Sequence, residues 1–511
     1  MSEALLKQPI ALNKTLITIT IMLVAILEVL DSTIVNVALP HMMSALGATT
    51  EQITWVLTSY IVASAVVLPI TGFLSDLMGR KQLLMINILG FMVSSALCGT
   101  AITLQEMVVL RIMQGAFGAT LIPLSQSVLR ETFPLEEQGR AMAIWGIGIM
   151  AAPVLGPTLG GYIVQHSSWR WIFYINIPVC ILGLVLTHFV IPNSVKQKIT
   201  RVDWTGLLLM VLGIGSLQLF LDQGNTKDWF NSNFIVAMAA IAIVTMSIFI
   251  IRGIVQQDKS LIKFTLYKDR NFAISSILLL SLCGALFGMM ALQPVMLENL
   301  FGYPAITAGQ IMAPRGLASA FGMMTAVPLI KKINVKWLLG IALIHCAIGS
   351  FLMANFTLQM NAQAMIFSSV LQGFGMGMFM VPISTYALAT LHKKDITEGA
   401  GLFSYARMLG TSVGISLLST LVTRETQINW NRLNGHINQF NPNLDTWLRG
   451  AHLRLNSDLT HQVLSNQLAQ QANMIAYLDA YYAIGIAFLL LLPLILLMKS
   501  VDLRHAKLGA H

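Results

Sequence analysis

Residues 15–39 read TLITITIMLVAILEVLDSTIVNVAL, and only Glu28 and Asp31 interrupt this apolar run with a charge. At about 1.5 Å per residue, a helix of this length crosses a hydrocarbon core of about 30 Å. The run is longer than the apolar core of a signal peptide, and no A-x-A cleavage pattern follows it. It therefore predicts a membrane-spanning helix that is retained in the mature chain.

Similar apolar runs recur along the whole sequence. Of the 511 residues, 56% are hydrophobic and 10% are charged, whereas about 25% of the residues in a soluble domain are charged. This composition excludes a water-soluble fold. Because a helix satisfies its own backbone polar groups in lipid, the runs predict an all-α integral membrane protein with fourteen spans, at 15–38, 52–73, 82–102, 107–128, 141–164, 171–191, 203–221, 232–251, 272–297, 305–329, 337–356, 363–389, 399–423 and 475–498.

Lysine and arginine are concentrated in every second loop between these spans. Cytoplasmic loops carry an excess of these residues, so the pattern places both termini in the cytoplasm and accounts for the net charge of +9 without a nucleic-acid partner. We expect a cytoplasmic N-terminus at 1–14, a six-span bundle at 15–191, two inserted spans at 203–251, a second six-span bundle at 272–498 that includes a periplasmic loop at 424–474, and a cytoplasmic C-terminus at 499–511.

The chain carries no sequence pattern for a metal site or a catalytic centre. Its four cysteines fall in four different apolar runs and lack the spacing of metal ligands, which argues against disulfides and zinc. There is no phosphate-binding loop and no nucleophile elbow. We therefore expect no enzyme activity, no cofactor and no self-contained ATP-driven pump.

An internal repeat is visible when the fourth span is laid on the twelfth. Gln114-Gly115 then falls on Gln372-Gly373, and in a similar alignment of the second span with the tenth, Lys81 falls on Lys336. Chance resemblance between glycine-rich packing helices is the alternative, but two concordant alignments favour a repeat of six-span halves. Such repeats form alternating-access transporters with a substrate site near the midplane.

Three charges inside the first half are candidates for proton coupling. Glu28 and Asp31 are three residues apart, so they share one face of their helix. Arg111 lies in the apolar fourth span, where a cation costs about 2.5–3.5 kcal/mol at the helix centre and needs a partner. Counted along their helices, Asp31 and Arg111 lie at depths where their side chains meet. Two alternatives remain: a purely structural ion bridge, and an arginine that extends to the outer interface.

Two further segments combine glycine with functional residue types. The loop 72–81 reads GFLSDLMGRK, in which glycine permits a tight turn and Asp76 can pair with a basic group or a helix N-terminus. A basic loop that serves only topology would explain Arg80 but not the glycines. The fifth span contains small residues and prolines that allow helices to approach closely or bend, namely Pro153, Gly156, Pro157, Gly160 and Gly161.

The second half carries a different set of polar residues. Its buried arginines favour anionic or weakly acidic compounds unless they are paired structurally, and its methionines suit promiscuous binding but more often fill a core. The candidate substrate-binding residues from both halves are Gln114, Arg315, Gln372, Met378 and Arg407.

Together these segments, with residues 30–40, WRWIFYINIP at 169–178 and YARMLG at 405–410, resemble the major facilitator superfamily and, within it, the fourteen-span drug:proton antiporters typified by EmrB. The resemblance covers about residues 15–498. It implies a conformational gate in the loop 72–81, a coupling role for Asp31 and Arg111, and an antiporter signature around Gly156-Pro157. The gating residues are Gly72, Asp76, Gly79 and Arg80.

The resemblance implies a proton-driven exporter of small hydrophobic compounds in the bacterial cytoplasmic membrane. A metabolite or siderophore exporter is the nearest alternative, followed by an uptake symporter. EmrB-like proteins work with a periplasmic EmrA-like adaptor and a TolC-like outer-membrane channel, so we expect adaptor docking on the loop 424–474. Leu464, Leu468, Ala472 and Ile475 recur there at helical spacing, which predicts an amphipathic helix that runs into the last span. Packing of this stripe against the protein itself is an equally good explanation.

Overall fold

The computed structural model describes residues 14–193, 203–256, 263–392, 395–437, 441–450 and 457–499, in which every regular element is a helix. The first part of the chain forms ten α-helices and one short 3₁₀ helix. These are α1 (Lys14–Ala45), α2 (Thr50–Ile53), α3 (Trp55–Val67), η1 (Leu68–Ile70), α4 (Thr71–Met78), α5 (Arg80–Thr100), α6 (Leu104–Gly118), α7 (Leu121–Thr132), α8 (Leu135–His166), α9 (Trp171–Tyr174) and α10 (Asn176–Val190).

The remaining helices form a pair in the middle of the chain and then a second bundle. The pair and its flanking turns are α11 (Trp204–Gln223), η2 (Trp229–Asn231), α12 (Asn233–Gln256) and η4 (Phe264–Lys268). The second bundle contains α13 (Arg270–Asn299), α14 (Ala305–Lys332), α15 (Val335–Met353), α16 (Ala362–Ala389), α17 (Ile396–Asn434), α18 (Pro442–Gly450) and α19 (Asp458–Leu496).

Each of the fourteen apolar segments predicted from the sequence lies on long helical structure. Within the described residues, twelve helical segments are long and apolar enough to cross a membrane. The other two predicted spans fall on α8 and α14, which are 32 and 28 residues long. The multi-pass helical architecture is therefore confirmed, while the count of fourteen and the cytoplasmic termini stay predictions.

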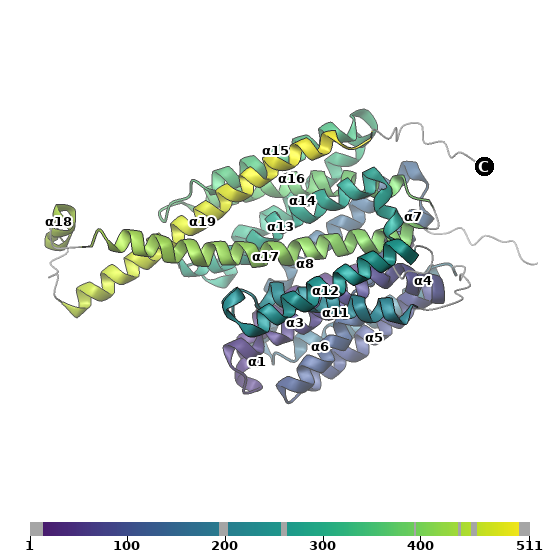
Figure 1. The fold of residues 1–511 in the computed structure, drawn as a ribbon, viewed down its shortest axis with the longest axis horizontal. Helices are drawn as coiled ribbons and strands as arrows, with labels where there is room; N and C mark the ends of the chain where they lie inside the picture. Colours follow the sequence, from purple (N-terminus) through teal and green to yellow (C-terminus); the bar gives the residue numbers. More distant parts are fainter. Residues whose placement is uncertain are drawn as a thin grey trace, which may run out of the picture.

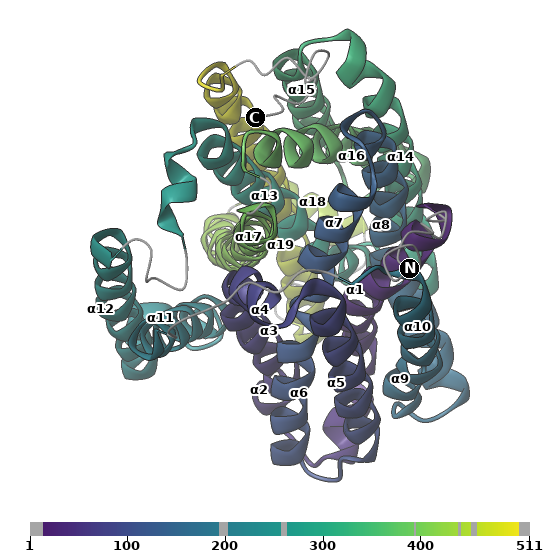
Figure 2. The ribbon, with the colours of Figure 1, turned by 90° about the vertical axis from the view of Figure 1, so that its right-hand side faces the viewer.

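The apolar cores follow the order of the helices along the chain. Two clusters of buried residues are built from residues between Ile17 and Ile191, and a third mainly from residues between Leu266 and Met498. Helix pairs such as α1 with α8 and α3 with α6 pack inside the first bundle, as α14 with α16 and α13 with α17 do inside the second. In Figure 2 the pair α11 and α12 lies beside the bundles, and α11 contacts both α3 and α17.

One close contact recurs in both bundles. In α6, a Cβ atom added to Gly115 would collide with the backbone of Tyr60 in α3; in α16, one added to Gly373 would collide with the backbone of Arg315 in α14. Gly115 corresponds to Gly373 in the sequence repeat, and Tyr60 corresponds to Arg315 in the register that aligns Lys81 with Lys336. The shared packing supports the repeat, and in both places glycine is required because the backbones approach closely.

The helices that carry the last two predicted spans extend beyond those spans. α17 continues past 423 to Asn434, and α19 begins at Asp458 instead of 475, so most of the segment 424–474 is helical. Each helix has 39 residues, or about 58 Å at 1.5 Å per residue, against a core of about 30 Å. They run side by side and project beyond the other helices, with α18 near their tip (Figure 1). The side chains of Leu464, Leu468 and Ala472 are buried. Contacts between α19 and α17 stabilise this extension.

Candidate proton-coupling site and substrate cavity

Five polar side chains from four helices, α1, α5, α6 and α10, meet inside the first bundle. Asp31 in α1 accepts hydrogen bonds from Arg111 Nη1 in α6 at 2.7 Å, from Gln114 Nε2 in α6 at 2.9 Å and from Asn176 Nδ2 in α10 at 2.8 Å. Asn176 also donates to Ser95 Oγ in α5 at 3.0 Å. Asp31, Arg111 and Gln114 are 0% exposed. The carboxylate is therefore shielded from solvent and held by one cation and two amides.

Arg111 lies in the protein interior and not at an interface. Its Nε donates to the Val56 carbonyl at 3.0 Å, and its Nη1 also reaches Gln114 Oε1 at 2.7 Å. Its guanidinium carbon lies 4.3 Å from the centre of the Tyr60 ring, the geometry of a cation–π contact. An arginine that extends to the outer surface is excluded by this burial. Nη2 has no partner among the described residues.

Glu28 lies one turn before Asp31 but outside this hydrogen-bonded cluster. Its Oε2 atom is buried and has no hydrogen-bond partner among the described residues. The sequence prediction grouped Glu28 with Asp31 and Arg111; the structure leaves Glu28 outside the hydrogen bonds that join those two residues.

The second bundle contains a comparable arginine cluster without a carboxylate. Arg315 in α14 donates to Gln293 Oε1 in α13 at 3.0 Å and to Gln372 Oε1 in α16. Gln372 also donates to Ser350 Oγ at 2.8 Å. Gln372 corresponds to Gln114 in the repeat, so each bundle pairs a buried arginine with this glutamine. A neutral amide, Gln293, binds Arg315 where the first bundle uses the acid Asp31 for Arg111.

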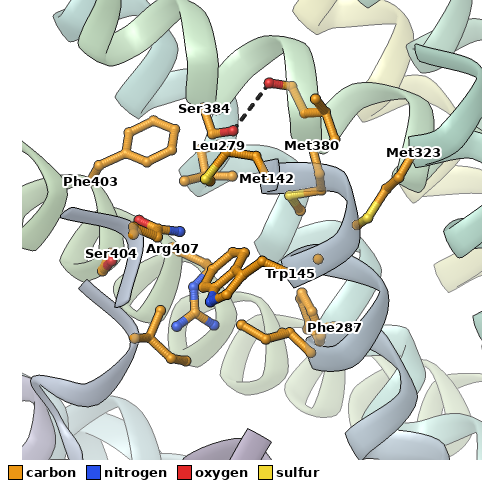
Figure 3. Close-up of a pocket in the computed structure, with 15 residues that line it drawn as sticks. Met142, Trp145, Leu279, Phe287, Met323, Met380, Ser384, Phe403, Ser404 and Arg407 are labelled. Atoms are coloured by element: carbon orange, nitrogen blue, oxygen red, sulfur yellow. Dashed lines mark hydrogen bonds between the residues drawn. The ribbon is translucent and has the colours of Figure 1, made fainter. Parts of the chain in front are cut away.

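A cavity of about 70 Å³ lies between the two bundles. Its lining comes from α7 and α8 of the first bundle and from α13, α14, α16 and α17 of the second, and it includes Trp145, Met323, Phe403 and Arg407 (Figure 3). Among the predicted substrate-binding residues, only Arg407 lines it. Gln114, Arg315 and Gln372 belong to the buried clusters, and Met378 is 3% exposed within the core of the second bundle.

The segment 72–81, predicted as a loop that acts as a gate, is mostly helical. Residues 72–78 belong to α4 and Arg80 begins α5, so the prediction of a loop is wrong: the turn between the two helices is made by Gly79 alone. Gly79 has φ +83°, a conformation that favours glycine.

Arg80 pairs with Glu131 at the end of α7. Gly72 packs on α17 of the other bundle, where an added Cβ would lie 2.6 Å from the Glu398 Cα atom. The segment 72–81 therefore connects helices of the first bundle and contacts the second.

Lys263 lies directly before η4 and pairs with two acids at the start of α17. Its Nζ lies 2.9 Å from Asp395 Oδ1 and 3.3 Å from Glu398 Oε2. Burial disfavours the ammonium, but the carboxylates of Glu398 and Asp395 outweigh this effect and raise the pKa of Lys263 above its ordinary value. The charges of Lys263 and Arg80 also act on Asp76. The sequence prediction did not identify Lys263 as part of this group of charges.

The antiporter signature lies on α8 and packs against α1. A Cβ on Gly156 would overlap Thr33 Oγ1, and one on Gly160 would lie 3.1 Å from the Ile34 carbonyl oxygen. Gly161 is less crowded, with Val37 Cγ1 at 4.0 Å. The side chains of Pro153 and Pro157 lie outside the described residues. These glycines allow α8 to contact α1 within one turn of Asp31.

Several residues of these sites were not singled out from the sequence. Asn176 and Tyr60 contact the Asp31 and Arg111 pair, Trp145 lines the cavity, and Glu131 and Lys263 pair with charges at the gate. Asn176 had one available signal, since it is an uncharged polar residue in the quoted segment WRWIFYINIP. Tyr60 and Trp145 resemble ordinary aromatic residues of membrane helices, and only the fold reveals their positions.

Two bundles of membrane-spanning helices with a cavity between them fit a transporter, and the family and relatives that match the chain show a transporter and not an enzyme. The chain belongs to the Major Facilitator Superfamily, whose sequence model matches residues 21–415. Solved structures agree in fold: the human organic anion transporter MFSD10 has a TM-score of 0.62 at 13% identity, covering 96% of this chain and 100% of its own. A double-tryptophan mutant of XylE has a TM-score of 0.62 at 15% identity, covering 96% of each chain.

Curated relatives match over almost the whole length. The fatty acid resistance protein FarB of Neisseria gonorrhoeae is 35% identical, with 97% of both chains covered. The multidrug export proteins EmrB of Haemophilus influenzae and of Escherichia coli strain K12 are 35% and 31% identical, with 95% of each chain covered. The protein is therefore a multi-pass protein of a bacterial inner membrane.

Proposed function

We propose that this transporter is a proton-coupled antiporter that exports hydrophobic drugs or other toxic small molecules. The names of its relatives, two multidrug export proteins and a fatty acid resistance protein, support export of hydrophobic compounds. The cavity between the bundles, with its apolar lining, supports the same substrate class. An exporter of one metabolite or siderophore is the alternative on this scaffold.

The observation that carries proton coupling is the buried pair of Asp31 and Arg111. Each bundle holds a buried arginine cluster. The cluster in the first bundle contains the acid Asp31, whereas Arg315 in the second bundle is bound by the neutral side chain of Gln293. The ionised form of a carboxylate is favoured beside an arginine and disfavoured when the two are separated in an apolar site. A movement of α1 relative to α6 would therefore let Asp31 take up a proton on one side of the membrane and release it on the other.

The proton gradient is the proposed energy source. Each elementary charge that crosses the membrane contributes about 2.3 kcal/mol per 100 mV. The close packing of Gly156 in α8 against Thr33 in α1 offers a mechanical link between the bundle and the segment that carries Asp31. Protonation of Asp31 would thereby favour one arrangement of the first bundle over the other.

Transport by purified protein in proteoliposomes tests this function. Ethidium, a hydrophobic weak acid of the uncoupler type and a neutral dye form a suitable panel, each followed after a pH gradient is imposed in the absence of ATP. We expect uphill transport of at least one probe, with protons moving in the opposite direction. Transport that proceeds equally without a gradient would contradict antiport. Resistance profiles of deletion and re-expression strains would then define the substrate range.

We also propose that the hairpin formed by α17 and α19 docks an EmrA-like adaptor, which in turn contacts a TolC-like channel. The hairpin projects from the bundle, and its Ile428 and Trp430 side chains are 53% and 37% exposed in α17. Removal of 436–470, or Ile428→Ser with Trp430→Ser, should abolish co-purification of the adaptor while proteoliposome transport persists. Unchanged co-purification and whole-cell efflux would exclude this surface.

A further inference from the structure

Helix α11 follows the first bundle in the sequence and packs along α3 of that bundle (Figure 2). A Cβ added to Gly215 in α11 would lie 3.9 Å from Val62 Cγ1 in α3, an ordinary van der Waals distance. At the last two residues of α11, the Thr58 hydroxyl of α3 donates to Asp222 Oδ2 and accepts from Gln223 Nε2 at 3.3 Å. Both apolar packing and hydrogen bonds therefore hold α11 on α3.

The same end of α11 also contacts α17 of the second bundle, through hydroxyl groups. Ser416 Oγ donates to the Leu221 carbonyl at 2.6 Å, and Gln218 Nε2 donates to Ser412 Oγ. Two further hydroxyls of α17 bind the turn that follows α11. We call these four side chains the hydroxyl row; they are Ser412, Ser416, Ser419 and Thr420. Because they are three or four residues apart, they share one face of α17.

The turn after α11 binds the end of the hydroxyl row. Asn225 Nδ2 donates to Ser419 Oγ at 3.0 Å, and Trp229 Nε1 donates to Thr420 Oγ1 at 3.0 Å. The Trp229 ring also packs on Phe220 of α11, with the ring centroids 5.2 Å apart. Its φ of +50° is sterically unfavourable for a bulky residue. These contacts fix the turn on α11, so the turn and the helix bind α17 as one unit.

The contact between the bundles differs at the two ends of α3. Residues 72–81 follow the end of α3 and η1, and there Gly72 packs directly on α17, with an added Cβ 2.6 Å from Glu398 Cα. Thr58 lies in the first turn of α3, at the opposite end. Ser412 lies about 21 Å beyond Glu398 along α17, at about 1.5 Å per residue. Helix α11 therefore links α3 to α17 on the side remote from residues 72–81, the predicted periplasmic side.

We infer that α11 moves with α3, and that its hydrogen bonds to the hydroxyl row close the cavity on the predicted periplasmic side and break when the cavity opens there. Hydrogen bonds between uncharged side chains are individually weak and can break one at a time. Separation of α11 from α3 would in addition disrupt the packing between the two helices. The inference rests on the proposed export function, which requires the cavity to open to both sides, and gives α11 a role in that cycle.

Two cysteine pairs compare the contact that should break with the contact that should persist. Asn225→Cys with Ser419→Cys joins the turn after α11 to α17, and Thr58→Cys with Asp222→Cys joins α3 to α11. Each pair replaces two short, hydrogen-bonded side chains, so a bis-methanethiosulfonate with a one-carbon spacer can bridge either pair. A reductant removes the bridge. The four native cysteines are buried and compete little for the reagent.

Transport is measured in proteoliposomes with the panel of ethidium, a hydrophobic weak acid and a neutral dye, before bridging, after bridging and after reduction. Bridging of Asn225→Cys to Ser419→Cys should abolish gradient-driven transport by the bridged molecules, and reduction should restore it. Bridging of Thr58→Cys to Asp222→Cys should leave the rate of the reduced protein unchanged, because α3 and α11 move together. The bridged fraction is determined by mass spectrometry on the same samples.

Removal of the hydroxyls gives a second test that needs no bridge. In right-side-out vesicles, an impermeant maleimide should label Ser404→Cys in the cavity roughly threefold faster or more when Ser412→Ala and Ser416→Ala are present, the effect expected for the loss of two hydrogen bonds. Thr411→Ala with Thr423→Ala is the matched control, because these hydroxyls donate to carbonyls of α17 itself. The control pair should leave the labelling rate unchanged.

The inference is overturned if transport continues with α17 bridged to the turn after α11, if the bridge between α3 and α11 blocks transport equally, or if the two alanine pairs give the same labelling rate. Labelling requires neither a substrate nor a proton gradient, so it tests the hydroxyl row independently of antiport. Equal labelling together with gradient-driven transport by the wild type would refute only the role of the row. Absence of gradient-driven transport of every probe by the wild type would refute the antiport function itself.

Discussion

Asp31 and Arg111 form an ion pair at 2.7 Å although both side chains are 0% exposed. They come from α1 and α6, and Gln114 and Asn176 complete the hydrogen bonding of the carboxylate. Because water cannot compensate either charge at this depth, each residue depends on the other. This mutual dependence leads to a prediction about stability that is separate from transport.

Asp31→Asn or Arg111→Gln alone should destabilise the protein by roughly 3–5 kcal/mol, since each leaves a buried charge unpaired. The double variant should be less destabilised than the sum of the two single variants, because no isolated charge remains. Unfolding in detergent, followed by circular dichroism, measures all three. Strictly additive effects would show that the two side chains do not interact.

Gly156→Ala should impair coupling, while Gly161→Ala should not. The new methyl group at 156 overlaps Thr33 Oγ1 and displaces α1 near Asp31, whereas at 161 it meets only Val37 Cγ1 at 4.0 Å. The ratio of protons to substrate moved in proteoliposomes should fall in the first variant alone. Equal behaviour of the two variants would mean that this contact does not transmit movement.

Gly72→Ala should separate α4 from α17 and open the cavity on the side of residues 72–81. The added Cβ would lie 2.6 Å from the Glu398 backbone and push α4 away from α17, whereas Gly309→Ala, the control, adds a methyl group with nothing within 4 Å. A cysteine in the cavity, Ser404→Cys, reports the opening. The four native cysteines are buried and provide a low background.

In inside-out vesicles, an impermeant maleimide should label Ser404→Cys faster in the Gly72→Ala background than in the Gly309→Ala background. The reason is that loss of the contact between bundles exposes the cavity from the side of residues 72–81. Identical labelling rates would argue against a gating role for this contact.

The contacts of Lys263 with Asp395 and Glu398 should be insensitive to pH in the physiological range. Folding raises the pKa of Lys263 above its ordinary value of 10.5, so its contribution to stability is complete below that value and is lost as the pH rises through the higher folded value. The difference in stability between the wild type and Lys263→Gln should therefore be constant from about pH 6 to about pH 9.

Lys14→Gln is the control for this pH experiment. Lys14 pairs with Glu137 at 2.7 Å, but the two side chains are 43% and 50% exposed, so its removal should have a smaller effect at every pH. If the difference caused by Lys263→Gln disappears near neutral pH, the three charged groups do not act as the structure indicates.

The helical membrane fold follows from the sequence because every apolar run must form its own hydrogen bonds in lipid. Hydropathy alone did not predict the ends of α17 and α19, although the helical spacing of Leu464, Leu468 and Ala472 predicted a helix that runs into the last span. Hydropathy marks where lipid ends, but these helices continue because Leu464, Leu468 and Ala472 are buried in contacts between helices. That stabilisation comes from packing between distant segments.

The residues of the candidate sites were also predictable from the sequence only in part. Asp31 and Arg111 were recognisable because charges are rare in apolar runs, and counting along the two helices predicted that they lie at similar depths. Asn176 and Tyr60 carry no charge, so nothing in the sequence separates them from neutral residues that only pack. Arg407 was recognisable as a charge, but its position in the cavity depends on how α17 packs between the bundles.

Transport by the Asp31→Asn variant shows whether protonation of Asp31 drives export. Purified wild-type and variant proteins are reconstituted, and substrate efflux and proton influx are recorded together under an imposed pH gradient, with ligand binding measured on the same samples. We predict that the variant binds substrate but moves neither protons nor substrate uphill, and that Glu28→Gln weakens transport or alters its pH dependence. Full gradient-driven transport by well-folded Asp31→Asn protein would contradict the account and leave Asp31 as a structural partner of Arg111.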